Sequence, residues 1–259
     1  MTTGIIGAGV MGETLLAGLL RAGMPPADLV VGERREDRRA ELAAKYGVEI
    51  ADNAAVAALS DTIILLVKPQ DMASVLGEIS PTLKPGALVI SIAAGITTTY
   101  LESLLPAGTH VVRAMPNTPA LFEEAMTAVS PGSTCTEQHL AVAEELLKSV
   151  GKVMQLPEKY QDAVTAISGS GPAYIYYVAE AMIEAGVMLG LPRDLATDMV
   201  KQTVFGAATM LKDSGLHPTV LREQVTSPGG TTVGLANGIV LADDKKIYSA
   251  ESLKVGLFK

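Results

Sequence analysis

Short apolar runs alternate with amphipathic stretches through the first part of the chain, as is typical of a parallel α/β sheet. Strands are expected at residues 3–6, 28–32, 62–67, 88–92, 110–113 and 126–129, and helices at 15–22, 38–46 and 137–150. Apart from Thr62, residues 62–67 are all apolar, as in a strand buried on both faces. The pattern therefore predicts a doubly wound sheet in residues 1–155.

From about residue 157 the strand signals fade, and helices are expected at 159–167, 173–189 and 194–212. Gly190 and Pro192 mark the break between the last two, because glycine ends helices and proline begins them. The sequence thus predicts a second, all-helical domain over residues 156–259.

Composition narrows the class of protein. The 259 residues are 48% hydrophobic with a mean hydropathy of +0.32, yet no run of about 18 uninterrupted apolar residues suggests a membrane span. Residues 173–191 come nearest, but Glu180 and Glu184 interrupt them, so a buried or oligomer-interface helix is the better interpretation. A net charge of −8 and 4% aromatic residues argue against nucleic acid as a partner.

Cys135 is the only cysteine, which excludes internal disulfides and cysteine-rich metal sites. The first residues hold neither a basic region nor a cleavable apolar segment, so nothing indicates secretion. We therefore expect a cytoplasmic protein without a metal.

A glycine-rich motif follows the first expected strand and opens the first helix: Gly7-Ala8-Gly9-Val10-Met11-Gly12. In G-x-G-x-x-G the first glycine permits a tight turn, the second lets pyrophosphate approach the backbone, and the third lets helix and strand pack closely. The motif predicts a Rossmann-type dinucleotide site; the alternative is a glycine-rich turn without a ligand.

The end of the second strand, where the adenosine ribose is expected, carries Glu33, Arg34 and Arg35. An acid here favours the ribose hydroxyls of NAD, whereas arginines favour the extra phosphate of NADP. We expect NADP (NADPH) to be preferred if Glu33 turns away, with NAD still possible. The alternative is a solvated helix start, because the charge run continues to Arg39.

Three further strand ends, 67–70, 93–95 and 115–119, supply small residues and prolines that suit a nicotinamide pocket, although each alone is compatible with an ordinary turn. Near the other end of the chain, residues 225–232 place hydroxyls around Pro228-Gly229-Gly230, and an apolar, helix-like segment follows. Hydroxyls and backbone N–H groups at a helix start suit a small carboxylate. The two sites together suggest a redox enzyme with a small acidic substrate.

At these residues the chain resembles the 1-pyrroline-5-carboxylate reductases, which catalyse the last step of proline synthesis. The resemblance runs from residue 4 to about 234. It rests on the motif at 6–12 and on the segments 67–70, 91–95, 113–119, 162–174 and 227–232, of which the last two are specific to the family.

The resemblance implies roles for individual residues. The substrate carboxylate would be held by Ser227, Gly229, Gly230 and Thr231, with the Thr232 hydroxyl at the ring nitrogen. The cofactor would contact Gly7 to Gly12, Arg34 and Arg35 at the ribose phosphate, Asn53 at the adenosine half, and Gln224 from a neighbouring subunit. The nicotinamide end would be lined by Leu66, Val67, Lys68, Pro69, Ala93, Ala94 and Asn117.

The resemblance also implies a helical domain that intertwines as a homodimer, with larger rings such as a homodecamer occurring in the family. Residues 235–259 differ from the longer helical C-terminal segment that the family usually has. Altered packing, a truncated end and weaker assembly are the alternatives for this segment.

Hydride reduction of a cyclic imine needs no strong general acid, which agrees with the absence of His110, His139 and His217 from every motif. A β-hydroxyacid dehydrogenase or another imine reductase is the runner-up, weakened because Lys159, Lys201 and Lys212 lie in no matching glycine-rich motif. A dinucleotide-sensing regulator is a different class of hypothesis, and it does not need the loop at 227–232.

Overall fold

The computed structural model describes residues 1–225, 236–242 and 245–253, with side chains up to residue 225. These residues form two compact units, Met1–Pro172 and Ala173–Lys259. The domain boundary that we predict after residue 155 lies earlier than this division and stays a prediction. No helix among the described residues has the length and apolar character that crossing a bilayer requires.

An eight-stranded sheet forms the centre of the first unit, in the order β3-β2-β1-β4-β5-β6-β7-β8. All neighbouring pairs are parallel except β6 with β7. The strands are β1 (Thr3–Ile6), β2 (Leu29–Gly32), β3 (Glu49–Ala51), β4 (Thr62–Leu65), β5 (Leu88–Ser91), β6 (His110–Met115), β7 (Ala125–Pro131) and β8 (Gly151–Gln155).

The order of the strands reverses at β1. Ile6, the last residue of β1, is paired with Gly32 of β2 on one side and with Leu65 of β4 on the other. The chain thus leaves β1 in one direction and returns to β4 in the other. Such a switch point opens a crevice beyond the carboxyl ends of the strands, where ligands of α/β sheets bind.

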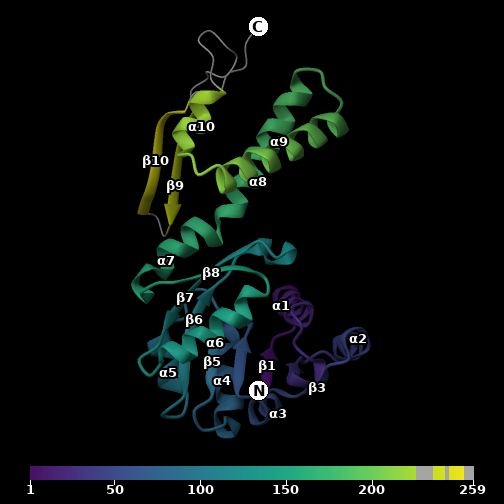
Figure 1. The fold of residues 1–259 in the computed structure, drawn as a ribbon, viewed down its shortest axis with the longest axis vertical. Coiled ribbons are helices and arrows are strands. Elements are labelled where there is room, and N and C mark those ends of the chain that lie inside the picture. Colours follow the sequence, from purple (N-terminus) through teal and green to yellow (C-terminus); the bar gives the residue numbers. More distant parts are fainter. Residues whose placement is uncertain (226–235, 243–244, 254–259) are drawn as a thin grey trace. The chain divides into compact units, whose positions relative to one another are not determined.

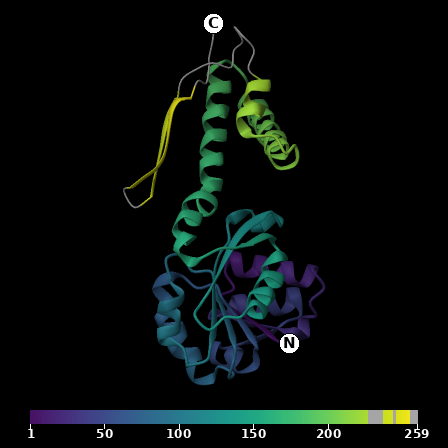
Figure 2. The same cartoon turned by 60° about the vertical axis from the view of Figure 1, so that its left-hand side comes forward.

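Helices cover both faces of this sheet (Figures 1 and 2). One apolar core joins the sheet to α1 (Val10–Arg21), α2 (Glu36–Tyr46) and α6 (Glu137–Lys148). A second core joins the opposite face to α3 (Asn53–Leu59), α4 (Met72–Ile79) and α5 (Thr98–Leu104). Strands β1, β2, β4 and β5 are buried along their whole length, which explains their continuous apolar runs.

Two strands of this sheet were absent from the prediction. β3 has three residues and β8 is largely exposed, so neither carries the apolar run that reveals a buried strand. Both lie at edges of the sheet, where a single paired neighbour suffices. The helices α3, α4, α5 and α10 were also absent, and each has only seven or eight residues.

Past β8 the chain becomes helical, as predicted. The 3-10 turn Glu158–Tyr160, α7 (Gln161–Val164) and the π-helical turn Thr165–Gly169 replace the single helix expected at 159–167. The second unit holds α8 (Gly171–Met188), α9 (Arg193–Asp213) and α10 (Pro218–Gln224). As expected, a glycine and a proline separate the last two long helices: α8 ends at Met188, Gly190 has a φ of +95°, and Pro192 caps α9.

An antiparallel hairpin of β9 (Ala236–Ala242) and β10 (Lys245–Leu253) follows in the second unit. The apolar segment that we expected to be helix-like is therefore a strand, and the unit is helical only up to Gln224 among the described residues. Ile239 and Val240 are β-branched, and such residues favour a strand once a partner strand is available.

Candidate functional site

The glycine loop after β1 brings two strands and a helix together. Gly7 has a φ of +99°, and its N–H donates to the Gly32 oxygen at 3.1 Å. A Cβ on Gly12 would collide with the Gly7 carbonyl, so only glycine lets α1 start this close to the strand. A Cβ on Gly9 would meet no atom, and no side chain caps α1. The first turn of α1 therefore faces open space that suits an anionic group.

A pocket of about 490 Å³ lies beyond the carboxyl ends of β1, β2 and β4, within the range of roughly 300–1,000 Å³ that is typical of ligand sites. The sequence-predicted cofactor residues that line it are Gly7, Arg34, Arg35, Asn53, Leu66, Val67 and Lys68. The remaining lining residues are Ile6, Gly32, Glu33, Gln70, Asp71 and Val75. Segments from four places in the sequence thus meet at the predicted adenosine site.

Several other predicted cofactor residues of the first unit are not part of the wall of this pocket. Ala8 is buried and Val10 is 71% exposed on the first turn of α1. Pro69 begins the 3-10 turn Pro69–Asp71. Beyond β5, Ala93 is buried and Ala94 is exposed. Gly9, Met11 and Gly12 belong to the glycine loop and the start of α1.

Three charged side chains, Glu33, Arg34 and Arg35, line the predicted ribose end of the pocket. A Glu33 oxygen accepts a hydrogen bond from the Arg35 backbone N–H at 2.9 Å, and the Glu33 side chain is only 11% exposed. The side chains of Arg34 and Arg35 are 61% and 64% exposed. The Glu33 carboxylate is therefore bonded to its own chain, 3.9 Å from Arg35 Nε, while the side chains of Arg34 and Arg35 line the pocket and are exposed.

Asn117 joins the end of β6 to the glycine- and serine-rich segment before α8. Its Nδ2 donates to the Ser168 oxygen at 3.0 Å, and its Oδ1 accepts from the Met126 N–H at 2.9 Å. Ser168 lies in the π-helical turn, a geometry frequent at functional sites. A Cβ on Gly169 would stand 2.8 Å from Met115 Cε, so this segment packs closely on β6.

Arg113, on β6, binds acidic side chains of the same region. Its side chain is only 5% exposed and forms ion pairs with Glu158 at 3.3 Å and Asp162 at 3.4 Å. Glu158 also accepts hydrogen bonds from the Thr98 N–H at 2.8 Å and hydroxyl at 2.6 Å. Since a buried charge needs such partners, this network ties β6 and α5 to the turn that leads into α7.

The cysteine and the helix glutamates that the sequence draws attention to are not part of the wall of this pocket. Burial raises the pKa of the Cys135 thiol, and its sulfur donates to the Val111 oxygen at 2.9 Å, so it is a poor nucleophile. Glu184, on α8, pairs with Arg193 at 2.5 Å. Within the described residues, no group of three or more histidine, cysteine or acidic side chains is arranged to bind a metal ion.

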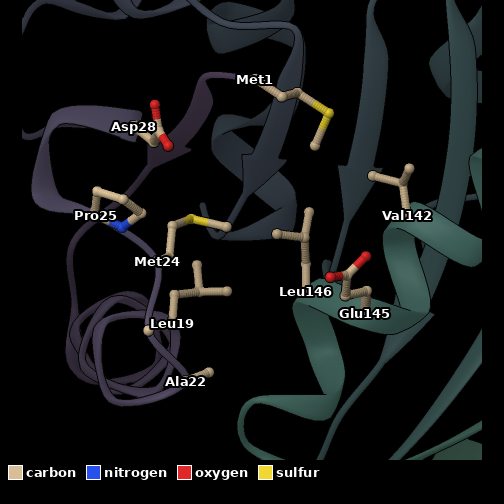
Figure 3. A pocket seen from close by; sticks show the side chains of 10 residues that line it. Met1, Leu19, Ala22, Met24, Pro25, Asp28, Val142, Glu145 and Leu146 are labelled. Atoms are coloured by element: carbon tan, nitrogen blue, oxygen red, sulfur yellow. The ribbon is translucent and has the colours of Figure 1, made fainter.

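A second pocket, of about 350 Å³, lies beside the amino end of β1, between the end of α1 and α6 (Figure 3). Met24 and Leu146 point toward each other across it, and Asp28 and Glu145 add two carboxylates. Its lining holds neither lysine nor arginine, the cations that suit a dinucleotide phosphate. Seven of the predicted cofactor residues line the first pocket, and none lines this one.

The predicted substrate residues Ser227, Gly229, Gly230, Thr231 and Thr232 lie outside the described residues. Gln224 is exposed at the end of α10 in the second unit. Sequence reasoning missed Asp71 and Val75, although Asp71 directly follows a predicted strand-end motif. It also missed Glu78, which contacts Arg34 and Asn53 from α4, a helix that was not predicted.

Comparison with known proteins agrees with this geometry. Residues 158–247 match the family described as pyrroline-5-carboxylate reductase dimerisation, and residues 2–95 match the family described as NADP oxidoreductase coenzyme F420-dependent. The chain is 44% identical over 236 residues to the pyrroline-5-carboxylate reductase of Corynebacterium melassecola, covering 90% of this chain and 87% of that protein. The enzyme of Methanosarcina acetivorans is 43% identical, covering 89% and 86%.

Solved structures show the same likeness. A pyrroline-5-carboxylate reductase from Coxiella burnetii has a TM-score of 0.84 and 36% identity, covering 89% of this chain and 87% of that one. A Plasmodium falciparum pyrroline carboxylate reductase with NADP bound has a TM-score of 0.79 and 31% identity, covering 89% and 86%.

The parallel sheet, its switch point and the glycine loop define a dinucleotide-dependent oxidoreductase. Within that class, the chain belongs to the pyrroline-5-carboxylate reductase family. Members of this family are NAD(P)-dependent and reduce 1-pyrroline-5-carboxylate in proline biosynthesis.

Proposed function

We propose that this protein reduces 1-pyrroline-5-carboxylate to L-proline and prefers NADPH as the electron donor, with NADH also accepted. The observation that carries the proposal is the pocket in which Arg34, Arg35 and Lys68 gather beside the glycine loop, in a chain of this family. Arg34 and Arg35 at the ribose end suit a cofactor with an additional phosphate. The NADP-bound relative supports the same choice.

The residues present fit a dinucleotide at each end of the pocket. The open space over Gly9 and the uncapped start of α1 suit the pyrophosphate, and Arg34, Arg35 and Asn53 suit the adenosine ribose. Leu66, Lys68, Ala94 and Asn117 are assigned to the nicotinamide end. Because both polar groups of Asn117 already bond to backbone, we propose that it acts by shaping this end of the site.

When bound, the reduced nicotinamide supplies the hydride that is added to the carbon of the imine. The family resemblance assigns the substrate carboxylate to Ser227 and the backbone of Gly229 to Thr231. The Thr232 hydroxyl would orient the ring nitrogen. The protonated imine already accepts hydride well, so a positioned hydroxyl suffices without a strong general acid.

Assembly and location form part of the proposal. We assign a homodimer through the second unit, with Gln224 contacting the cofactor of the neighbouring subunit, and allow for a larger ring. The dimerisation family match supports the dimer. A cytoplasmic location agrees with a single, free cysteine, and the net charge of −8 argues against nucleic acid as a partner.

The direct test is oxidation of NADPH by the purified protein in the presence of 1-pyrroline-5-carboxylate, repeated with NADH. We expect turnover with both, a higher kcat/KM with NADPH, and L-proline as the product identified by mass spectrometry. Binding of either cofactor without turnover would contradict the proposal and favour a cofactor-sensing protein.

Replacing Thr232 tests the substrate site separately. We expect Thr232→Ala to lower kcat/KM by roughly 100-fold, the low end of the range for a side chain positioned at the reacting group, with little change in the Kd for NADPH. Thr209→Ala is a matched control, because the Thr209 hydroxyl bonds the Phe205 oxygen within its own helix, α9. Activity equal to that of the parent would eliminate the role of Thr232.

A further inference from the structure

One carboxylate reaches the ribose end of the cofactor pocket from outside its wall. Glu78, on α4, accepts a hydrogen bond from Arg34 Nη2 at 3.2 Å through Oε1. Its other oxygen accepts from Asn53 Nδ2 at 2.6 Å. Ser74, one turn earlier, donates to Oε1 at 3.4 Å. Glu78 thus joins α4 to residues at the end of β2 and at the start of α3.

The two donors that Glu78 engages are the ones assigned to the adenosine ribose. Arg34 is the cation expected at the 2′-phosphate, and Asn53 is buried with its Oδ1 against Gly32, at 2.9 Å from the position of an added Cβ. This packing fixes the direction in which Asn53 Nδ2 points. A phosphate oxygen at this place would need hydrogen bonds that Glu78 already accepts.

The charge of Glu78 matters as much as its hydrogen bonds. A phosphate bound by Arg34 would lie within a few ångströms of the Glu78 carboxylate, and the two negative charges would repel each other. A ribose with a free 2′-hydroxyl carries no such charge. Glu78 is 43% exposed, so solvent weakens this repulsion without removing it.

We infer that Glu78 is a specificity-determining residue, which competes with the 2′-phosphate of NADPH for Arg34 and so lowers the preference for NADPH over NADH. The inference rests on the proposed function, in which Arg34 contacts the ribose phosphate. It adds that the carboxylate of Glu78, on the neighbouring helix α4, lowers the selectivity of this site for NADPH over NADH.

The test is the Kd of NADPH and of NADH, measured by fluorescence titration of the full-length protein. We expect Glu78→Gln, which keeps the size and an acceptor for Asn53, to tighten NADPH binding by roughly three- to tenfold and to leave NADH within about twofold. Glu78→Ala should act in the same direction. The gain should shrink at high ionic strength, since salt screens partly exposed charges.

Two further variants make the test specific. Glu144→Gln is a matched control, because Glu144 on α6 also accepts from one cation, Lys148 at 3.0 Å, and one amide, Gln155 at 2.6 Å. It should change neither Kd. Arg34→Ala should weaken NADPH and spare NADH, and the gain from Glu78→Gln should vanish in the Arg34→Ala background.

An unchanged or weaker Kd for NADPH in Glu78→Gln overturns the inference, as does an equal gain for both cofactors. A gain that persists without Arg34 overturns the competition for that residue. Turnover of 1-pyrroline-5-carboxylate by the parent protein is measured in parallel. If the parent protein turns over 1-pyrroline-5-carboxylate but Glu78→Gln leaves the ratio of the two Kd values unchanged, only the role of Glu78 is overturned. If Glu78→Gln shifts that ratio but the parent protein shows no turnover, the role of Glu78 is supported and the proposed function is overturned.

Discussion

A single histidine at the start of α6 has both a structural and an electrostatic role. The His139 Nδ1 accepts a hydrogen bond from the Thr136 N–H at 3.1 Å, which completes a capping box. Its ring stacks on that of His110, with centroids 3.7 Å apart. Burial and the neighbouring His110 lower the pKa of His139 below its ordinary value. The folded protein therefore disfavours the charged imidazole.

This pKa shift predicts a pH dependence of stability. Because the folded-state pKa lies below the unfolded one, the contribution of His139 is fully present above about pH 6.5 and is lost as pH falls below it. His139→Gln keeps a capping acceptor and cannot titrate. We expect its free energy of unfolding, measured in urea, to match that of the parent near neutral pH and to fall less on acidification.

His217→Gln is the control for this prediction, because it removes a different cap histidine, at the start of α10. It should leave the acid sensitivity of the parent in place. An equally steep loss of stability in His139→Gln would contradict the proposed linkage.

At the scale of elements, α1 and α2 are joined by one carboxylate. Glu13, one residue past the glycine motif, accepts hydrogen bonds from Lys45 Nζ at 2.9 Å and Tyr46 Oη at 2.8 Å, and pairs with Arg38. The hydrogen bond from Lys45, with those from Arg38 and Tyr46, lowers the pKa of Glu13 to about 2. These contacts hold α2 next to the helix that begins the cofactor loop.

We expect Glu13→Gln to lower the free energy of unfolding by about 1–2 kcal/mol at neutral pH, since hydrogen bonds to a charged group are lost at a partly exposed site. The lowered pKa means that this stabilisation is present above the unfolded value near 4.5 and is lost as pH falls toward 2. Urea unfolding at neutral and at acidic pH measures both effects.

Glu41→Gln serves as the control, because Glu41 makes an exposed pair with Arg38 alone, at 2.6 Å. Glu41→Gln should lower the free energy of unfolding by less than Glu13→Gln does, because exposed ion pairs contribute little to stability. A difference between Glu13→Gln and the parent that stays constant down to pH 2 would contradict the pKa argument.

Elements differ in how well the sequence predicts them. The buried strands β1, β2, β4 and β5 were predicted to within two residues at each end, because burial on both faces demands unbroken apolar runs. Edge strand β3 and helix α3 are short and need few apolar residues, so their sequences carry little signal. The strand β9 was predicted as helix because its pairing partner, β10, is not evident from local sequence.

At the scale of the whole molecule, α8 is a long apolar helix with no buried residue. Ile175, Tyr177 and Val178 are 52%, 73% and 53% exposed. Exposed apolar surface of this kind marks an interface, and the residues belong to the dimerisation family match. The apolar composition that we noted at residues 173–191 is thus explained by association between subunits rather than by burial within one.

We expect the protein to have at least twice its chain mass of 26.9 kDa in solution, measured by light scattering. Tyr177→Asp should shift it toward the monomer, because a carboxylate would be desolvated at the interface. Leu59→Asp is a matched control on an exposed apolar residue of the first unit, 42% exposed, and should not change the mass. A parent protein that is monomeric at assay concentrations would point to weakened assembly, one of the alternatives for residues 235–259.

The sequence by itself determined the glycine loop, the two arginines at the end of β2 and the two-part organisation, because each depends on residues that are adjacent in the chain. Tertiary structure decided what those residues contact. Arg34, Asn53 and Glu78 are separated by up to 44 positions and come together only when β2, α3 and α4 pack. Side-chain pairing between distant elements leaves no local pattern in the sequence. The contact of the Glu78 carboxylate with the ribose site therefore became visible only in the fold.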